Sequence, residues 1–227
     1  MKKTTMLTTK PSVSFAIACF LFTGMMAAPV SAQVDVGLDN VFIAPDGSVT
    51  MDIMISPTGA PQTMNNFDFT FLIDNSGATA GSRLEFVEAL STEAFVFTPS
   101  YVFSANSDAE DQNAPVNTLQ PDTASPNDTI MAFDLTFDFL DIALNSEKLM
   151  TQLQFQHFAG GSPLATIGDT FGVSVDGFVD NIDGDIITVN AGSGSVTVAA
   201  IPEPGTFLAC AAITSLVTMR RRRRSRQ

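Results

Sequence analysis

The sequence predicts an all-β protein, with an antiparallel jelly-roll-like β-sandwich of about nine strands. Apolar and polar residues alternate at a period of two along much of residues 33–200, which is the spacing of strands. Glycine, proline, asparagine, aspartate and serine cluster between the alternating segments, as they do at turns. Apolar residues at helical spacing are scarce in this region, so we expect two stacked sheets.

Two segments show the alternation most clearly. In residues 67–74 (FDFTFLID), one face carries Phe67, Phe69, Phe71 and Ile73, and the other carries Asp68, Thr70 and Asp74. In residues 131–139 (MAFDLTFDF), one face carries Met131, Phe133, Leu135, Phe137 and Phe139, and the other carries Ala132, Asp134, Thr136 and Asp138. Since successive side chains of a strand point to opposite faces, we expect each apolar face to be packed and each polar face to be in water.

Weaker signals complete the pattern. We predict further strands at residues 48–55, 84–89, 94–98, 149–158, 171–175, 185–189 and 195–199. Turn sequences separate the strands at residues 44–47, 56–59, 75–77, 160–163, 183–184 and 192–194. Residues 104–128 have few apolar side chains and predict a long acidic surface loop. The spacing of Leu140, Ala143 and Leu144 predicts a short helix at residues 139–148.

The first 32 residues have the order of a secretory signal peptide. A start with Lys2, Lys3 and Lys10 precedes the apolar run at residues 15–22, and the small residues of Val30-Ser31-Ala32 follow. We predict an apolar signal-peptide helix and cleavage after Ala32. The alternative is a permanent membrane anchor, but residues 12–26 are short for a span of about 20 apolar residues.

The remaining body is strongly acidic and contains no cysteine. Residues 33–200 carry 23 of the 24 acidic residues of the chain against two cations, Arg83 and Lys148, which makes a formal charge of −21. Such a body repels phosphate backbones, so we expect no nucleic acid partner. Divalent cations, basic proteins and neutral polysaccharides remain compatible with it. Cys19 and Cys210 both lie in the end segments, which excludes a disulfide, thiol catalysis and a thiolate metal site in the body.

The last 27 residues, 201–227, form a separate segment. Gly205–Met219 carries no charge and spans at most about 22 Å as a helix, which is short of a hydrocarbon core of about 30 Å. The arginines of residues 220–226 are expected in the cytoplasm, which leaves the body outside. We therefore predict a hydrophobic helix at residues 205–219 that inserts transiently rather than permanently.

This segment resembles the PEP-CTERM sorting signal of bacterial exported proteins. The resemblance rests on Pro202-Glu203-Pro204, the apolar stretch that Gly205 opens, and the basic cluster of Arg220, Arg221, Arg222, Arg223 and Arg224. It implies recognition by an exosortase-type membrane transpeptidase, removal of the tail, and delivery to the cell surface or an extracellular matrix. The alternative is an ordinary short tail anchor.

The body is similar to a cohesin-type module of the carbohydrate-binding superfamily. The similarity rests on residues 65–71 (NNFDFTF), 84–87, 149–155, 168–170 and 194–198, which follow the strand order of such modules. It implies a nine-stranded sandwich. Dockerin binding does not carry over, because no partner-facing residues match.

One acidic stretch is a candidate metal site. Residues 176–185 (DGFVDNIDGD) place four carboxylates and an amide within ten residues, and calcium takes six to eight hard oxygen ligands. Asp180, Asp183 and Asp185 are the expected ligands. The alternative is a plain acidic turn between two strands, because the spacing is not that of a helix-loop-helix calcium loop.

No catalytic constellation or resident cofactor is expected. His157 is the only histidine and lies in register with Leu149, Leu153 and Phe155, so we assign it a structural role. A pair of acids for glycoside hydrolysis has no distinguishing pattern among so many carboxylates. The amides of Gln152, Gln154 and Gln156 form a polar ladder that suits a polysaccharide or ice only weakly, and the chain has no tryptophan for sugar stacking.

The sequence thus favours an exported, non-enzymatic protein of the cell surface or extracellular matrix that acts by adhesion or structural binding. The alternative function is a carbohydrate-binding module for extracellular polysaccharide, with calcium ordering its acidic turn. Expected partners are the sorting transpeptidase, surface proteins and extracellular polysaccharide.

Overall fold

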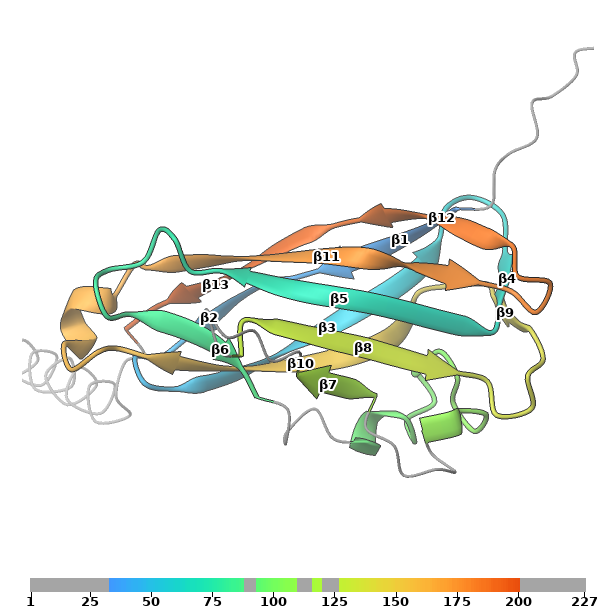
Figure 1. The fold of residues 1–227 in the computed structure, drawn as a ribbon, viewed down its shortest axis with the longest axis horizontal. Coiled ribbons are helices and arrows are strands. Elements are labelled where there is room, and N and C mark those ends of the chain that lie inside the picture. Colours follow the sequence, from blue (N-terminus) through green and yellow to red (C-terminus); the bar gives the residue numbers. More distant parts are fainter. Residues whose placement is uncertain (1–32, 88–92, 110–115, 120–126, 201–227) are drawn as a thin grey trace, which may run out of the picture. The chain divides into compact units, whose positions relative to one another are not determined.

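The structure is a computed structural model that describes residues 33–87, 93–109, 116–119 and 127–200 (Figure 1). These residues form mainly strands, with two short 3₁₀ turns, η2 (Glu93–Phe95) and η3 (Pro163–Thr166). The strands are β1 (Gln33–Leu38), β2 (Asn40–Ile43), β3 (Ser48–Pro57), β4 (Gln62–Met64), β5 (Asn66–Asp74), β6 (Arg83–Phe86), β7 (Asn117–Leu119), β8 (Thr129–Leu135), β9 (Ile142–Leu144), β10 (Lys148–Phe158), β11 (Thr170–Asp180), β12 (Ile186–Ala191) and β13 (Ser193–Val198).

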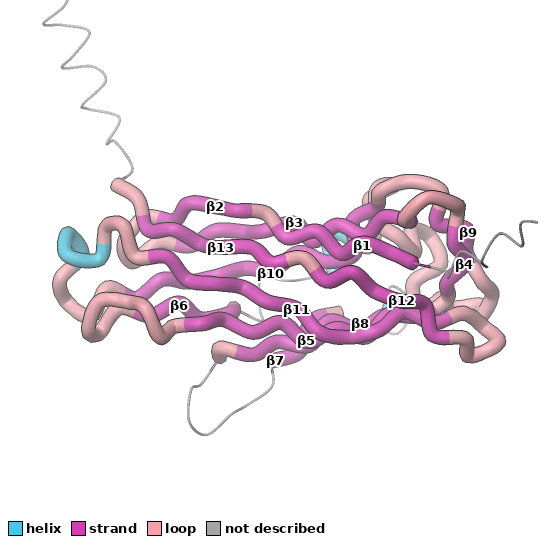
Figure 2. The backbone as a smooth tube through the Cα atoms, turned by 90° about the horizontal axis from the view of Figure 1, so that it is seen from above, coloured by secondary structure: helices cyan, strands magenta, loops and turns pink. Residues whose placement is uncertain are grey.

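The strands make two packed layers, which confirms the predicted β-sandwich. One layer runs in the order β6-β10-β3-β1, and the other in the order β11-β5-β8-β7. Strand β12 joins them, because it pairs with β1 on one side and with β11 on the other. Strand β13 lies between β11 and β2 (Figure 2). The prediction of a purely antiparallel sandwich is wrong in one respect, because the β1–β12 and β2–β13 ladders are parallel.

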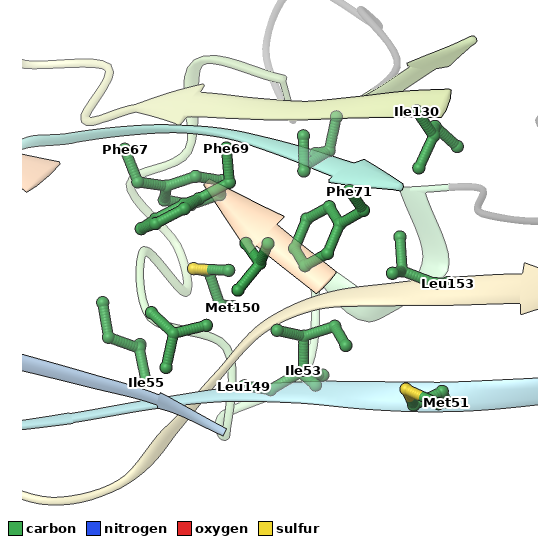
Figure 3. Close-up of a cluster of buried hydrophobic side chains, with 14 of the residues drawn as sticks. Met51, Ile53, Ile55, Phe67, Phe69, Phe71, Ile130, Leu149, Met150 and Leu153 are labelled. Atoms are coloured by element: carbon green, nitrogen blue, oxygen red, sulfur yellow. The ribbon is translucent and has the colours of Figure 1, made fainter. Parts of the chain in front are cut away.

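The core fills the space between the two layers. The three phenylalanines of β5, Phe67, Phe69 and Phe71, are buried and point toward the apolar side chains of β3 and β10, as Figure 3 shows. The β3 contribution is Met51, Ile53 and Ile55, and β10 adds Leu149, Met150 and Leu153. The face predicted for residues 67–74 is therefore confirmed.

Strand β8 is turned the opposite way from the prediction. Ala132 and Asp134 of β8 and the following Thr136 are buried. Phe133 of β8 is 40% exposed, and Phe137 and Phe139 of the turn after it are 47% and 61% exposed. The register explains the reversal, since residues opposite one another in an antiparallel pair point to the same face. Ala132 lies opposite Phe69 and Asp134 opposite Phe67, so the buried face of β5 carries these β8 residues inward with it.

Three further local predictions differ from the structure. Residues 94–98 form the end of η2 and a turn instead of a strand. Residues 139–148 contain β9, which pairs with β4, instead of a helix. The segment 104–128 is not a surface loop throughout, because Ser107, Ala109, Val116 and Asn117 are buried and β7 pairs with β8.

The end segments lie outside the described residues. This applies to the predicted signal-peptide helix of residues 1–32, to the hydrophobic helix 205–219, and to the sorting residues of 201–226. Across the part of the chain that the structure describes, no helix is long and apolar enough to cross a membrane.

Candidate functional site

The outer face of the β11-β5-β8-β7 layer carries exposed apolar side chains in the middle of an acidic domain. Asp68 of β5 has Phe178 of β11 on one side and Phe133 of β8 on the other. In the next row, Thr70 lies between Asp176 and Met131. Leu72 follows in β5, and it is exposed, as Phe133 and Phe178 are. We call Leu72, Met131, Phe133 and Phe178 the apolar face.

The turn that follows β8 also carries exposed apolar side chains. Phe137, Phe139 and Leu140 are all exposed there. The turn is held by hydrogen bonds rather than by packing: Thr136 Oγ1 donates to the Leu140 carbonyl at 2.9 Å, and the Asn106 amide donates to the Asp138 carboxylate at 2.9 Å. The hydrogen bond from Asn106, and after it the one that the Leu140 main-chain N–H donates at 3.1 Å, lower the pKa of Asp138. A hydrogen-bonded frame thus presents aromatic side chains to solvent.

The apolar face has an acidic surround. Asp68 lies within it, partial burial raises the pKa of Asp68, and Asp176 flanks it on β11. The two cations of the body are on the other layer. Arg83 of β6 pairs with Glu85 and lies over the Phe158 ring at 4.4 Å, and Lys148 of β10 donates to the Pro99 carbonyl at 3.3 Å. The charges of the face therefore suit a cationic neighbour.

The three predicted calcium ligands are close in sequence, but the structure does not gather them into a ligand set. Asp180 ends β11, and Asp183 and Asp185 are exposed in the following turn. Asn181 organises this turn, because its side-chain oxygen accepts the main-chain N–H groups of Asp183 at 3.0 Å and Asp185 at 2.9 Å. Within residues 33–200, as far as they are described, no group of three or more His, Cys, Asp or Glu side chains is placed to hold a metal. The calcium site stays a prediction.

His157 is buried, as its register predicted, and it has hydrogen-bond partners that sequence reasoning missed. Its Nδ1 accepts the main-chain N–H of Asp46 at 3.2 Å, and its Nε2 lies 3.0 Å from Ser82 Oγ. Since Nδ1 is an acceptor, the proton is on Nε2 and is donated to Ser82. A nucleophilic serine needs the opposite direction, with the hydroxyl donating to the imidazole. The pair therefore has the geometry of a structural contact.

The predicted glutamine ladder lies on the outer side of β10 and is partly engaged within the protein. The Gln152 amide donates to Asp52 Oδ1 at 2.7 Å, and the Gln156 amide donates to the Asp46 carbonyl at 3.1 Å. These two hydrogen bonds connect β10 to β3 and to the turn at residues 44–47. This leaves less of the ladder available to a ligand.

Sequence reasoning also missed a buried polar cluster around Asp134. Its carboxylate accepts hydrogen bonds from Tyr101 Oη at 2.5 Å, Ser107 Oγ at 2.6 Å, and the main-chain N–H groups of Ala109 and Leu135 at 3.4 Å and 2.8 Å. Burial raises the pKa of Asp134, although these hydrogen bonds oppose the rise. The cluster ties residues 101–109 to β8. No local pattern marks it, because Asp134 follows the same alternation as the exposed acids.

The fold matches solved cohesin structures. The chain is similar to the sixth cohesin of Acetivibrio cellulolyticus scaffoldin B, solved with a mutant Cel5 dockerin, with 15% identity, a TM-score of 0.50, and coverage of 74% of this chain and 99% of that chain. It is also similar to the OlpC cohesin of Clostridium thermocellum, solved with the dockerin Doc435, with 11% identity, a TM-score of 0.50, and coverage of 77% and 99%. No protein-family model and no curated protein sequence matches the chain. The described body is thus a cohesin-like β-sandwich.

Proposed function

We propose that this chain is an exported, non-enzymatic protein of the cell surface or extracellular matrix whose sandwich docks a protein partner through the apolar face. The outward orientation of β8 is the observation that carries this proposal. It exposes Phe133, and the turn that follows β8 exposes Phe137 and Phe139, whereas a monomeric domain gains nothing from phenylalanines in water. Aromatic side chains at the centre of a surface patch are typical anchors of protein interfaces.

The chemistry of the face favours a protein with an apolar centre and a basic rim. Asp68 and Asp176 provide the negative charges that complement such a rim. The two cohesin structures were each solved with a dockerin, which supports protein binding as the use of this fold. A glycan is favoured less, since Tyr101 is buried and two amides of the glutamine ladder are engaged.

The ends of the chain support export and sorting. The leader of residues 1–32 and the PEP-CTERM-like tail of residues 201–227 are the features that an exosortase substrate needs. Val198 leaves β13 beside Asp169, at the end of the sandwich opposite the turn of residues 137–140. Mass spectrometry of the mature protein should find Gln33 at its start and no Arg220–Arg226.

Site-specific photo-crosslinking in the source cells tests the docking face. A photoreactive phenylalanine analogue at position 133 is compared with the same analogue at position 42, because Phe42 is 67% exposed on β2, away from the apolar face. We expect a protein adduct from position 133 and none from position 42. The adduct should weaken in Phe178→Ser, which removes a neighbouring anchor, and persist in Phe42→Ser.

Two results would overturn the docking proposal. Equal adducts from positions 133 and 42 indicate nonspecific contact. An adduct with polysaccharide instead of protein from position 133 supports the carbohydrate-binding alternative. Because processing of the tail is measured separately, failure of docking and failure of sorting are distinguishable.

A further inference from the structure

Three turns meet around His157 at the end of the sandwich that includes η3, at the left in Figure 1. They are the turn between β2 and β3 at residues 44–47, the turn before β6 at residues 79–82, and the segment that follows β10 at residues 159–169. His157 is the next-to-last residue of β10, is fully buried, and is the only histidine of the chain. Its ring touches two of the three turns through different nitrogens.

The Nδ1 side holds the β2–β3 turn. Asp46 donates its main-chain N–H to Nδ1, and its backbone is in the left-handed region at a φ of 54°. The same turn is linked to β10 by the His157 N–H, which donates to the Gly47 carbonyl at 2.9 Å, and by Asp46 Oδ1, which accepts the Ala159 N–H at 2.7 Å. The imidazole thus contacts a turn whose backbone conformation is costly for a residue other than glycine.

A series of hydrogen bonds leads from Nε2 of His157 to the end of β13. Ser82 Oγ lies 3.0 Å from Nε2, and the Ser82 main-chain N–H donates to the Thr79 carbonyl at 2.8 Å. Thr79 Oγ1 in turn donates to Asp169 Oδ1 at 2.8 Å. The Asp169 carbonyl accepts the main-chain N–H of Val198 at 2.9 Å. His157 is therefore connected by a series of hydrogen bonds to the last strand of the sandwich.

This arrangement requires a neutral imidazole. A protonated ring carries a hydrogen on Nδ1, which would face the Asp46 N–H donor to donor. The carboxylates of Asp46 and Asp169 are the charged groups that act on the ring, and they favour the cation. Arg83, beside Ser82, is turned toward Glu85 and the Phe158 ring. Burial outweighs the two carboxylates, so it lowers the pKa of His157 below the usual 6.5.

We propose that His157 is an acid-sensitive latch, which ties the turns at residues 44–47 and 79–82 to β10 when neutral and releases them when protonated. The direction of the pH dependence follows from linkage. The unfolded state binds the proton more tightly, so the contribution of the latch is complete above 6.5 and is lost as the pH falls from 6.5 through the folded-state pKa. The release loosens the end of the sandwich from which β13 leads toward residue 201.

Nuclear magnetic resonance and hydrogen exchange test the latch in the mature protein. Because the chain has one histidine, its ring signals need no assignment by mutation. At about pH 8 we expect the ring signals to show the proton on Nε2. At about pH 5 we expect hydrogen-exchange protection at the Ala159 and Ser82 amides to fall by about tenfold or more, after correction for intrinsic exchange. Thr136 and Phe137 amides, at the opposite end, serve as the internal control and should change less.

The variant His157→Asn separates the latch from a general effect of acid. The asparagine side-chain oxygen replaces Nδ1 as an acceptor but cannot be protonated in this range, so the pH dependence at Ala159 and Ser82 should disappear. Unchanged dependence in this variant would overturn the proposal. If the variant does not fold, the wild-type protein still decides, because a proton on Nδ1 at about pH 8, or titration of the ring without a change at the Asp46 and Ser82 amides, contradicts the latch.

Discussion

Asp134 shows how a single buried carboxylate is accommodated in the core. Its position is set by the pairing of β8 with β5, and burial alone would disfavour its charge. Hydrogen bonds from Tyr101, Ser107, Ala109 and its neighbour Leu135 offset part of that cost. In return, the carboxylate anchors residues 101–109, which have little regular secondary structure of their own. The charge of Asp134 also raises the pKa of Tyr101, after burial as the larger cause.

Tyr101→Phe should reveal the contribution of this cluster to stability. The ring contacts with Phe95 and Phe103 are retained, but Asp134 loses one donor, so we expect the free energy of unfolding to fall by about 1.5–3 kcal/mol. The loss should be larger at neutral pH than below 3.8, because the hydroxyl stabilises the ionised carboxylate and the folded-state pKa of Asp134 is raised. Denaturant titration measures both. Thr50→Val, which removes an exposed hydroxyl, should change stability by less than about 0.5 kcal/mol, and an equal loss there would contradict the prediction.

At the scale of elements, strand β8 is the clearest case in which a neighbour overrides a local pattern. Its more apolar side faces solvent. The side that faces the core lies next to the three buried phenylalanines of β5, opposite which it places its own residues. Ala132 is small enough to lie opposite Phe69 in that position. Phe133, which is exposed as a result, belongs to the apolar face that we propose as the docking surface.

A matched pair of phenylalanine substitutions tests the orientation of β8. Phe69→Ala should lower the free energy of unfolding by about 3–5 kcal/mol, because it opens a cavity in the core. Phe133→Ala, one strand away and facing outward, should cost about 1 kcal/mol or less. Denaturant unfolding of both variants measures the difference. A cost at Phe133 as large as that at Phe69 would show that β8 is turned the other way.

Strand β11 contains a glycine whose missing side chain makes room for the core. A Cβ at Gly177 would clash with the Asp68 carbonyl oxygen and lie 2.6 Å from a ring carbon of Phe69. A Cβ at Gly172 in the same strand would come no closer than 3.7 Å to the Asp74 side chain. We expect Gly177→Ala to lower the thermal midpoint and to cost about 1–3 kcal/mol, whereas Gly172→Ala should be neutral or stabilising by about 0.5–1 kcal/mol. Equal midpoints for the two variants would contradict this packing.

At the scale of the whole molecule, the main feature that affects stability is the large negative net charge of the body. A body of residues 33–200 with a formal charge of −21 has few internal cations to balance its carboxylates. The fold accepts this because most of the acids lie on the outer faces of the sheets or in turns. Mutual repulsion of these charges opposes the compact state. Their combined negative potential attracts basic partners to the domain.

Stability should therefore rise with ionic strength. Raising sodium chloride from about 0.01 M to about 1 M shortens the Debye length from about 30 Å to about 3 Å, which screens the repulsion within the folded domain. We expect a higher thermal midpoint at the higher salt concentration, measured by circular dichroism. Sucrose at matched osmolality controls for exclusion effects. A midpoint that falls with added salt would show that attractive ion pairs outweigh the repulsion.

The predictability of the fold differed between elements for a physical reason. Strands β3, β5 and β10 were predicted closely, because each carries a long alternation with its apolar face in the core. The short strands β4, β7 and β9 were missed, since three residues carry too little pattern. Strands β1 and β2 were missed as well. The sequence also singled out Asp180, Asp183 and Asp185, whereas the network around His157 depends on Ser82 and Asp46, far away in the chain.

By itself, the sequence determined the β-sandwich class, the acidic and cysteine-free body, and the positions of the long strands β3, β5 and β10, because these depend on composition and on local alternation. It placed only the first half of β11, since residues 176–180 were predicted to be part of an acidic turn. Only the tertiary structure decided which face of β8 is buried, which donors surround Asp134, and which turns His157 holds together. A period of two divides a strand into two faces, but pairing with a neighbouring strand selects the face that enters the core. That selection is nonlocal, and it is what places Phe133 in solvent.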